Sequence, residues 1–377
     1  MAVVLLLFVA WSAPPEEPVI AGETLTVWRE RMNQIDPADP QSARWTPGLT
    51  AIVETESLPW FTRRQAALTL GRMGLLAADA VPVMRRHLND VGDPPDAGPQ
   101  LWALKALALF GPVARDAAPD VARVLKSPST PALSRLTAVD ALSQIGPGHP
   151  VVIPTLIAFA GDQSAPDLRR AAIEALGMSG PAAASALPVL VRALDDSDEN
   201  VRREAATSLG KLGPNGEPAQ FALLERLAID EIPAVQDAAA TALAAIGPVV
   251  GPQLLPLLES DDAETRRRVV TILGTWRASS RLWVMAVQSR WDDPSPAVRL
   301  AALEAAWQIT ARGEPIARRI ATELTVDDRQ LRIAAVRLLA RLGAEAKSAE
   351  PVLRELLQHD RTDVRLAVEK ALEVIDE

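Results

Sequence analysis

The sequence predicts an all-α protein, an α-solenoid built from about ten helical hairpins. Two observations lead to this fold class. Alanine and leucine dominate the 377 residues, tyrosine is absent, and β-branched runs of strand length are scarce, so the composition favours helix. One helical pattern also recurs at intervals of 30 to 37 residues. Such a period is typical of a repeat array rather than of several globular domains.

The recurring helix is clearest in the segment VRREAATSLGKLG. Its apolar side chains fall three or four positions apart and therefore share one face: Val201, Ala205, Leu209 and Leu212. Gly213 ends the helix with a residue suited to a left-handed cap. A single helix of this kind cannot bury its apolar face, so stacking on neighbouring copies is expected.

Three columns of residues align the copies. The first column is basic or amidic: Arg63, Gln100, Arg135, Arg169, Arg202, Gln236, Arg266, Arg299, Arg332 and Arg365. Three positions later comes a small residue: Ala66, Ala103, Ala138, Ala172, Ala205, Ala239, Val269, Ala302, Ala335 and Val368. Seven positions after the first column the residue is leucine in every copy except at Ala306. The agreement over ten copies predicts one helix of this type in each repeat.

A second helix is expected between consecutive copies. Examples are ALPVLVRAL over 186–194 and AEPVLRELL over 349–357, each with a proline that fits a first helical turn. Acidic residues such as Asp195 and Asp196 follow the first of these and precede the next copy. Each repeat is therefore predicted to be a helical hairpin of about 33 residues.

The sequence before the repeats divides into two parts. Residues 1–13 are a candidate signal peptide, because an apolar run from Ala2 to Trp11 is too short to span a bilayer and small residues precede a cleavage after Ser12. Residues 14–43 are predicted to form an extended linker and a capping helix over 24–33. The solenoid then covers 44–377. The chain is expected to be exported, to the periplasm or another extracytoplasmic space, if Met1 to Ser12 is a signal peptide, and to be cytoplasmic otherwise.

The hairpins and the pattern (D)xxxxVRxxAAxxLGxLG resemble HEAT repeats, and the short period is most similar to the HEAT-like repeats of phycobilisome lyases. The resemblance implies a right-handed superhelix with the second helix of each hairpin on the concave side. It also implies a ladder of acidic turn residues with helix arginines, here Asp196 with Arg202 and Asp293 with Arg299.

No catalytic, metal or cofactor site is predicted. The chain has no cysteine, and its three histidines, His87, His149 and His359, lie in different repeats without metal-ligand spacing. It contains no GxSxG motif and no glycine-rich phosphate loop. A net charge of -9 argues against a general nucleic-acid binder.

Repeats seven and eight depart from the consensus in a concentrated way. Residues 264–320 contain ten arginines and five acids, although the whole chain is acidic, and four of the nine tryptophans lie there. Arginine and tryptophan are enriched at interface hot spots. We therefore take eight residues as a candidate anchor patch for a protein partner: Arg267, Arg268, Trp276, Arg277, Arg281, Trp283, Arg290 and Trp291.

Two interpretations of this cluster stay open. Trp276 and Trp307 could instead fill core volume where small residues were lost. The arginines are expected to be exposed, because an arginine is not buried without a partner. An acidic protein segment is the preferred ligand, ahead of a nucleic-acid phosphate or an anionic lipid head group.

The sequence therefore predicts a non-enzymatic scaffold that binds a protein partner on the solenoid surface, along its concave face. Two alternatives are a subunit or regulator of an enzyme complex, as in chromophore lyases, and a purely architectural spacer. No cofactor and no membrane span are expected. The oligomeric state is not determined by the sequence.

Overall fold

A computed structural model describes residues 17–92, 98–277, 280–359 and 361–376. The chain divides into two compact units, Met1–Leu156 and Ile157–Glu377. The candidate signal peptide, residues 1–13, lies outside the described residues, and its cleavage stays a prediction. In the described residues both units consist of helical hairpins, which confirms the all-α solenoid fold class.

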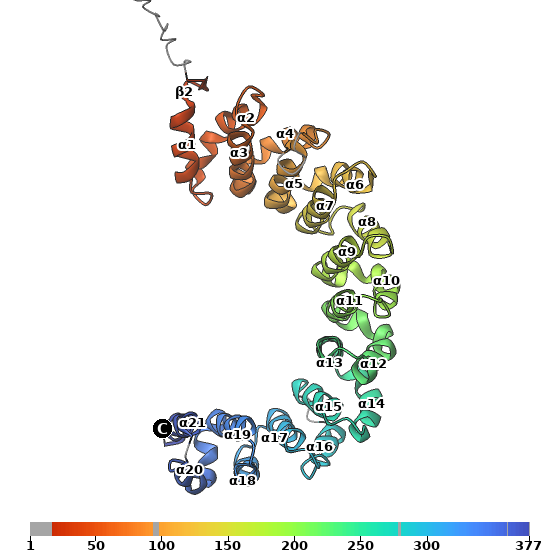
Figure 1. The fold of residues 1–377 in the computed structure, drawn as a ribbon, viewed down its shortest axis with the longest axis vertical. Helices are drawn as coiled ribbons and strands as arrows, with labels where there is room; N and C mark the ends of the chain where they lie inside the picture. Colours follow the sequence, from red (N-terminus) through yellow and green to blue (C-terminus); the bar gives the residue numbers. More distant parts are fainter. Residues whose placement is uncertain (1–16, 93–97, 278–279, 360, 377) are drawn as a thin grey trace, which may run out of the picture. The chain divides into compact units, whose positions relative to one another are not determined.

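The first unit begins with a two-stranded antiparallel sheet and continues with helices (Figure 1). Its elements are β1 (Val19–Ile20), β2 (Glu23–Thr24), α1 (Leu25–Gln34), η1 (Pro40–Trp45), α2 (Thr46–Glu54), α3 (Trp60–Met73), η2 (Gly74–Ala80), α4 (Val81–His87), α5 (Pro99–Phe110), η3 (Gly111–Ala117), α6 (Ala118–Lys126) and α7 (Ala132–Ile145). Helix α8 (Val152–Ala160) contains the boundary between the units.

The second unit contains the remaining hairpins. Its elements are α9 (Pro166–Met178), η4 (Gly180–Ala186), α10 (Leu187–Ala193), α11 (Glu199–Lys211), η5 (Gly213–Ala219), α12 (Gln220–Ile229), α13 (Pro233–Ile246), η6 (Pro248–Val250), α14 (Gly251–Leu254), η7 (Leu255–Glu259), α15 (Ala263–Thr275), α16 (Arg281–Gln288), α17 (Pro296–Thr310), α18 (Glu314–Glu323), α19 (Arg329–Leu342), η8 (Gly343–Ala349), α20 (Glu350–Leu356) and α21 (Thr362–Asp376).

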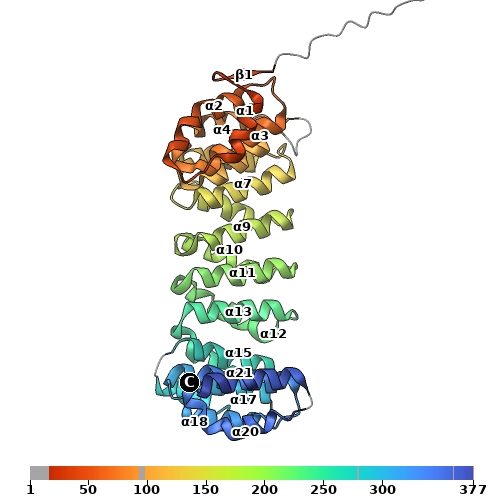
Figure 2. The same cartoon turned by 90° about the vertical axis from the view of Figure 1, so that its left-hand side faces the viewer.

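Within each unit the odd-numbered helices pack side by side in one layer, which we call the odd-helix layer. Most even-numbered helices pack against the next odd one; before α15 it is the 3₁₀ segment η7 that does so. In the second unit, α9, α11 and α13 run as successive rungs (Figure 2). The predicted alanine and leucine columns point into the core: Ala205 and Leu209 are fully buried, as are their equivalents in most repeats. The hydrophobic pattern therefore specifies which face of each odd helix is covered.

Helix α1 closes the odd-helix layer of the first unit. It buries Leu25, Trp28 and Met32, the three residues predicted to share one face. It lies beside α3, because the Arg29 guanidinium donates to the Thr62 hydroxyl at 3.2 Å. The indole of Trp28 donates to the carbonyl of Ile20 at 2.8 Å, which attaches the small sheet to the helix.

Close stacking of odd helices depends on the residue after the leucine column. At Gly210 an added Cβ would lie 2.8 Å from the Cα of Ala242, so α13 can approach α11 only because this residue is glycine. The equivalent positions hold Ala244 in α13 and Trp307 in α17. The pairs α13–α15 and α17–α19 pack less closely than α11–α13. At α11 the lack of a side chain at this one position therefore permits the close approach of α13.

Most repeats contain a 3₁₀ segment that the sequence pattern had not predicted. Odd helices end at glycines with positive φ, such as Gly180 (φ 53°) and Gly213 (φ 60°), and a 3₁₀ turn follows. A 3₁₀ helix has three residues per turn, so residues three apart share one face. Small residues occupy that face, and Ala183 and Ala186 are fully buried. The segment turns the chain from the odd helix into the shorter even helix.

The first column forms a hydrogen-bonded ladder. Every arginine or glutamine of the column donates to a backbone carbonyl at or just after the end of the preceding even helix, at 2.6–3.4 Å. Carbonyl groups at a helix end have no partner within their own helix. The column therefore satisfies these acceptors and fixes each odd helix against the even helix before it.

Four arginines of the ladder also bind a carboxylate at the end of the following even helix or in the turn after it. Arg169 pairs with Asp196, Arg202 with Asp230, Arg266 with Asp293 and Arg299 with Glu323, at 2.7–2.9 Å. The pairings implied by the resemblance, Asp196 with Arg202 and Asp293 with Arg299, are therefore wrong. Arg202 and Arg299 donate to the backbone carbonyls of Asp196 and Asp293, not to their carboxylates. Each carboxylate therefore joins an odd helix to the end of the even helix that follows it.

The ladder geometry alters the acidity of its carboxyl groups. Burial alone would raise the pKa of Asp293, but hydrogen bonds from Arg266 and from the Ser295 amide lower it below its ordinary value. At Asp230 burial would likewise raise the pKa, but hydrogen bonds from Arg202 and from the Ile232 amide lower it below its ordinary value. Both groups are therefore held as carboxylates.

One segment, Trp60–His87, is long and apolar enough by composition to cross a membrane. The two helical segments 233–246 and 248–259 meet at a sharp bend, and they are long and apolar enough to cross a membrane only when they are taken together as one span. Within Trp60–His87 the helix is interrupted at Gly74, where φ is 54°. Of the most apolar 18-residue stretch in this segment, 56% is buried inside the protein. Burial in the repeat core accounts for this apolar character.

We predict that breaking one ladder ion pair destabilises the second unit. Arg266→Met keeps most of the packing of the side chain but leaves the buried Asp293 carboxylate without its guanidinium, so the free energy of unfolding falls by about 3–5 kcal/mol. Urea unfolding followed by circular dichroism measures the change. As a control, Arg318→Met removes an exposed pair with Glu314 and costs under about 1 kcal/mol. Equal losses in the two variants would contradict the role of the ladder.

We also predict a specific acid dependence. Because the pKa values of Asp230 and Asp293 are lower in the folded than in the unfolded chain, their stabilisation is complete above the unfolded value of about 3.9. It is lost as the pH falls through the lower folded value. A variant with both residues changed to Asn should therefore lose less stability than the parent below about pH 4. Urea titrations over a pH series test this, and parallel curves would refute it.

Candidate functional site

The eight residues of the candidate anchor patch are spread over α15, the turn after it, α16 and the residues beyond α16. Arg267 and Arg268 lie in the first half of α15, whereas Trp276, Arg277 and Arg281 lie around the turn between α15 and α16. The ten residues from Arg267 to Arg277 correspond to about 15 Å of helix. Trp283 lies within α16, and the last two residues, Arg290 and Trp291, lie beyond its end. The structure therefore does not bring the eight together as one surface.

The expectation that the arginines are exposed is wrong for two of them. Arg266 is buried in its ion pair with Asp293, and Arg268 is 7% exposed and pairs with Asp237 at 2.7 Å. Each has an anionic partner supplied by a neighbouring repeat, so burial leaves no unpaired charge. A count of charges along the sequence could not reveal these partners, because it does not show which carboxylate lies next to which arginine in the folded chain.

Two tryptophans of the cluster are structural. Trp283 is 6% exposed and its ring covers Gly251, where an added Cβ would lie 2.2 Å from the ring. The indole of Trp276 donates to the carbonyl of Ala244 at 2.9 Å, and its ring centre lies 5.8 Å from that of Trp283. Trp283 is therefore a core residue and not a surface anchor, and Trp276 fastens the end of α15 to α13.

The residues after α16 are also engaged within the protein. Arg290 donates to the carbonyl of Leu258 at 2.9 Å and pairs with Glu259. Trp291 is half-buried, and its indole nitrogen has no hydrogen-bond partner among the described residues. The Arg290 side chain therefore joins the end of α16 to the preceding hairpin.

Arg277 and Arg281 are the most accessible arginines of the eight. Both are exposed and have no ion pair among the described residues. Arg277 has a φ of 47° at the position where other repeats have a glycine. An L-residue in this left-handed conformation is strained. Its guanidinium is nevertheless free for a ligand.

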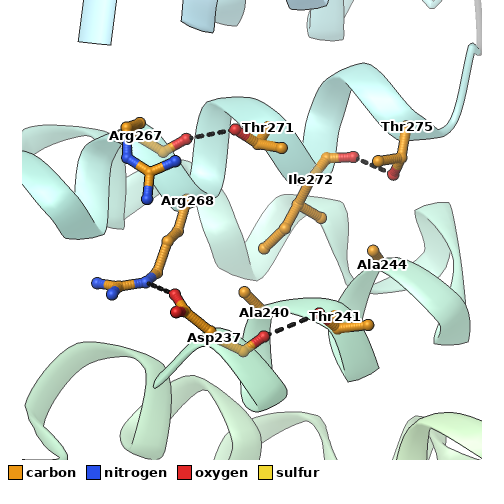
Figure 3. Close-up of a pocket in the computed structure, with 9 residues that line it drawn as sticks. All are labelled: Asp237, Ala240, Thr241, Ala244, Arg267, Arg268, Thr271, Ile272 and Thr275. Atoms are coloured by element: carbon orange, nitrogen blue, oxygen red, sulfur yellow. Dashed lines mark hydrogen bonds and ion pairs between the residues drawn. The ribbon is translucent and has the colours of Figure 1, made fainter. Parts of the chain in front are cut away.

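The region where the layer widens forms a groove between α13 and α15 (Figure 3). The groove has a volume of about 390 Å³ and is lined by Asp237, Ala240, Thr241, Ala244, Arg267, Arg268, Thr271, Ile272 and Thr275. Helix α15 packs less closely on α13 than α13 packs on α11. Two residues of the predicted patch, Arg267 and Arg268, therefore belong to this groove.

The groove offers both hydrogen-bond donors and acceptors. The Nη1 of the buried Arg268 has no hydrogen-bond partner among the described residues, while its Nε donates to Asp237 (Figure 3). The hydroxyls of Thr241 and Thr271 donate to carbonyls of their own helices, which leaves their oxygens as acceptors. A ligand that carries carboxylates and N–H groups would match this lining, and a polypeptide has both.

The histidines lie apart, and each is engaged locally. His87 stacks on Trp102, and burial together with the charge of Arg63 lowers its pKa. The ring of His149 accepts a hydrogen bond from the Val151 amide, and His359 contacts the guanidinium of Arg332. In the described part of the chain no three His, Asp or Glu side chains are grouped as a metal site.

A family model described as HEAT repeats matches residues 92–177, 162–244 and 251–329, together more than half of the chain. The chain belongs to the HEAT-repeat family. This confirms the resemblance drawn from the arginine, alanine and leucine columns. A search of curated proteins found no match.

Two solved structures share the fold of this chain. Importin beta has a TM-score of 0.56 at 15% identity, and the match covers 93% of this chain and 53% of importin beta. The karyopherin Kap121p, bound to the extreme C-terminus of the protein phosphatase Cdc14p, has a TM-score of 0.56 at 13% identity, with 93% and 45% covered. The chain thus spans about half the length of these proteins. The CpcE–CpcF phycocyanin lyase of Nostoc sp. PCC7120 has a TM-score of 0.35 at 20% identity, with 68% and 94% covered.

Sequence reasoning did not identify the other wall of the groove. Asp237 and Thr241 lie on α13, in a repeat that otherwise follows the HEAT consensus. The available signal was the shortest repeat interval, 30 residues from Gln236 to Arg266. It points to altered stacking between these two repeats.

We predict that Arg277→Gly stabilises this HEAT array. Glycine adopts the left-handed conformation without the clash of Cβ, so the free energy of unfolding should rise by about 1 kcal/mol. Thermal unfolding of the two proteins measures the change, with Arg281→Gly as a control that carries the same loss of charge. A destabilisation after Arg277→Gly would show that the arginine side chain stabilises the turn.

Proposed function

We propose that this HEAT-repeat chain is a non-enzymatic scaffold that binds a protein partner on its odd-helix layer. The observation that carries the proposal is the α13–α15 groove, which is lined by the partly exposed Arg267 and by Arg268. A carboxylate of a bound segment would pair with the guanidinium of Arg267. We infer that an acidic segment of the partner occupies this groove.

The fold supports a protein ligand in general. Karyopherins with this fold are bound to protein segments in two of the solved structures, to the extreme C-terminus of Cdc14p and to Ste12p. A stacked array also offers a long surface on which many weak contacts add up. Here the exposed positions of the odd helices carry the specificity, while the buried columns maintain the stack.

We predict that Arg267→Glu weakens partner binding. Arg267 lines the groove and is partly exposed, with only Glu264 on its own helix as a partner. Reversal of its charge would repel an acidic segment and lower the affinity about tenfold, equivalent to about 1.4 kcal/mol. Affinity capture from the source cells, quantified by mass spectrometry, identifies proteins that depend on Arg267. Isothermal titration with the identified partner then gives the affinity.

The matched control is Arg203→Glu, because Arg203 holds the equivalent position of α11, is exposed and changes the net charge equally. Binding should also weaken as salt is raised, since screened charges attract less. The proposal fails if no captured protein distinguishes the Arg267→Glu variant from the Arg203→Glu variant.

A further inference from the structure

A pair of aromatic side chains is exposed at the start of α3. Trp60 is 47% exposed and Phe61 is 50% exposed, and their ring centres lie 6.1 Å apart in an edge-to-face arrangement. Large aromatic rings contribute most when they are covered, so two half-exposed neighbours leave substantial apolar surface in water. The anchor patch predicted from the sequence did not include them.

The repeat pattern gives no structural reason for these aromatics. They precede the column residue Arg63 by three and two positions. At the first of these positions, the other repeats have alanine, proline or a polar residue, for example Pro166, Glu199 and Pro233. Such residues suffice to begin the helix. Trp60 and Phe61 are therefore additions to the repeat rather than parts of its stacking machinery.

The surroundings of the pair are basic. The Arg64 guanidinium lies 5.5 Å from the ring centre of Trp60, and that of Arg29 lies 5.5 Å from the ring centre of Phe61. Helices α3 and α5 contain no acidic residue, although the whole chain has a net charge of -9. Among the described residues, Arg64, Arg72 and Lys105 have no ion pair; each is exposed. The positive charge of this surface is thus not neutralised locally.

A groove of about 460 Å³ adjoins the aromatic pair. It is lined by Phe61, Arg64, Gln65, Leu68, Arg72 and Leu109. Leu109, on α5, is 48% exposed. Gly71 allows α5 to approach α3, because an added Cβ there would lie 2.7 Å from the carbonyl oxygen of Ala106. The groove therefore combines apolar side chains on two closely packed helices with the guanidinium groups of Arg64 and Arg72.

We propose that this α3–α5 surface, formed by Trp60, Phe61, Arg64, Leu68, Arg72, Lys105 and Leu109, docks an extended acidic segment of a protein partner. An apolar side chain of the segment lies between Phe61 and Leu109, and neighbouring carboxylates bind Arg64, Arg72 and Lys105. Arginine favours such contacts because its planar group binds carboxylates through two parallel hydrogen bonds. The inference rests on the proposed scaffold function and adds a docking surface in the first unit.

A single-stranded nucleic acid would also use cations and aromatic rings. Two observations favour protein. The arginines already lie at cation–π distance from both rings, which occupies faces that a base would need. The groove floor is aliphatic, formed by Leu68 and Leu109, and suits an apolar side chain better than a stacked base.

The test uses the full chain and fluorescence anisotropy. The probe is a short fluorescein-labelled peptide that alternates glutamate with phenylalanine and leucine; its lysine counterpart and a labelled oligothymidine serve as comparison probes. The acidic peptide should bind the parent protein at least about tenfold more tightly than either comparison probe. Equal or tighter binding of oligothymidine would overturn the proposal in favour of nucleic acid.

Two double variants locate the binding. Trp60→Ala with Phe61→Ala, and Arg64→Glu with Arg72→Glu, should each weaken acidic-peptide binding at least about tenfold. All four side chains are exposed, and circular dichroism checks that the fold is retained. Matched controls are Phe221→Ala, an aromatic that is 68% exposed on α12, and Arg203→Glu; neither should change the affinity. Unchanged affinity in both double variants would refute the proposal.

One comparison separates this inference from the scaffold function. If Arg267→Glu abolishes peptide binding while the α3–α5 variants do not, the inference is wrong and the scaffold proposal stands. If the α3–α5 variants lose binding and Arg267→Glu retains it, the inference holds independently of the α13–α15 groove. If the parent shows no preference for the acidic peptide, this inference fails, and the groove is judged by its own capture experiment.

Discussion

The ladder of arginine and glutamine side chains holds this protein together. Each member donates to a carbonyl near the end of the preceding even helix or in the turn after it, and four arginines also bind a carboxylate at the end of the following even helix or in the turn after it. Because these bonds lie within the stack, they fix the hairpins without using the exposed face of the odd helices. That face can then vary from repeat to repeat, which is how a uniform scaffold can present different docking surfaces.

The sequence predicted the buried columns well and the ion pairs poorly. The alanine and leucine columns repeat with a helical period, so their burial followed directly from the pattern. The pairings of Asp196 and Asp293 were wrong because spacing within one hairpin does not show which neighbouring repeat lies nearer in space. The 3₁₀ segments were not predicted. Ala183 and Ala186 lie three residues apart, and that spacing fits an α-helix as well as a 3₁₀ helix.

The candidate site, like the fold, could be predicted only in part from the sequence. The sum of charges over repeats seven and eight identified an unusual region but could not distinguish Arg268, which is buried in an ion pair, from Arg277 and Arg281, which are exposed. The aromatic pair Trp60 and Phe61 was not predicted as a binding site, because it lies in the first turn of its helix, outside the aligned columns. In the sequence these two positions differ from the equivalent positions of the other repeats. The exposure of both rings in the folded chain is what points to a binding role.

Site-specific photo-crosslinking in the source cells tests most directly whether the odd-helix layer binds a protein. A benzophenone side chain would be placed at Leu68 in the α3–α5 groove, at Thr271 in the α13–α15 groove, and at Phe221 on the even helix α12. The scaffold account predicts discrete protein adducts from Leu68 and Thr271 and none from Phe221. Adducts from Phe221 alone, or from none of the three positions, would contradict it.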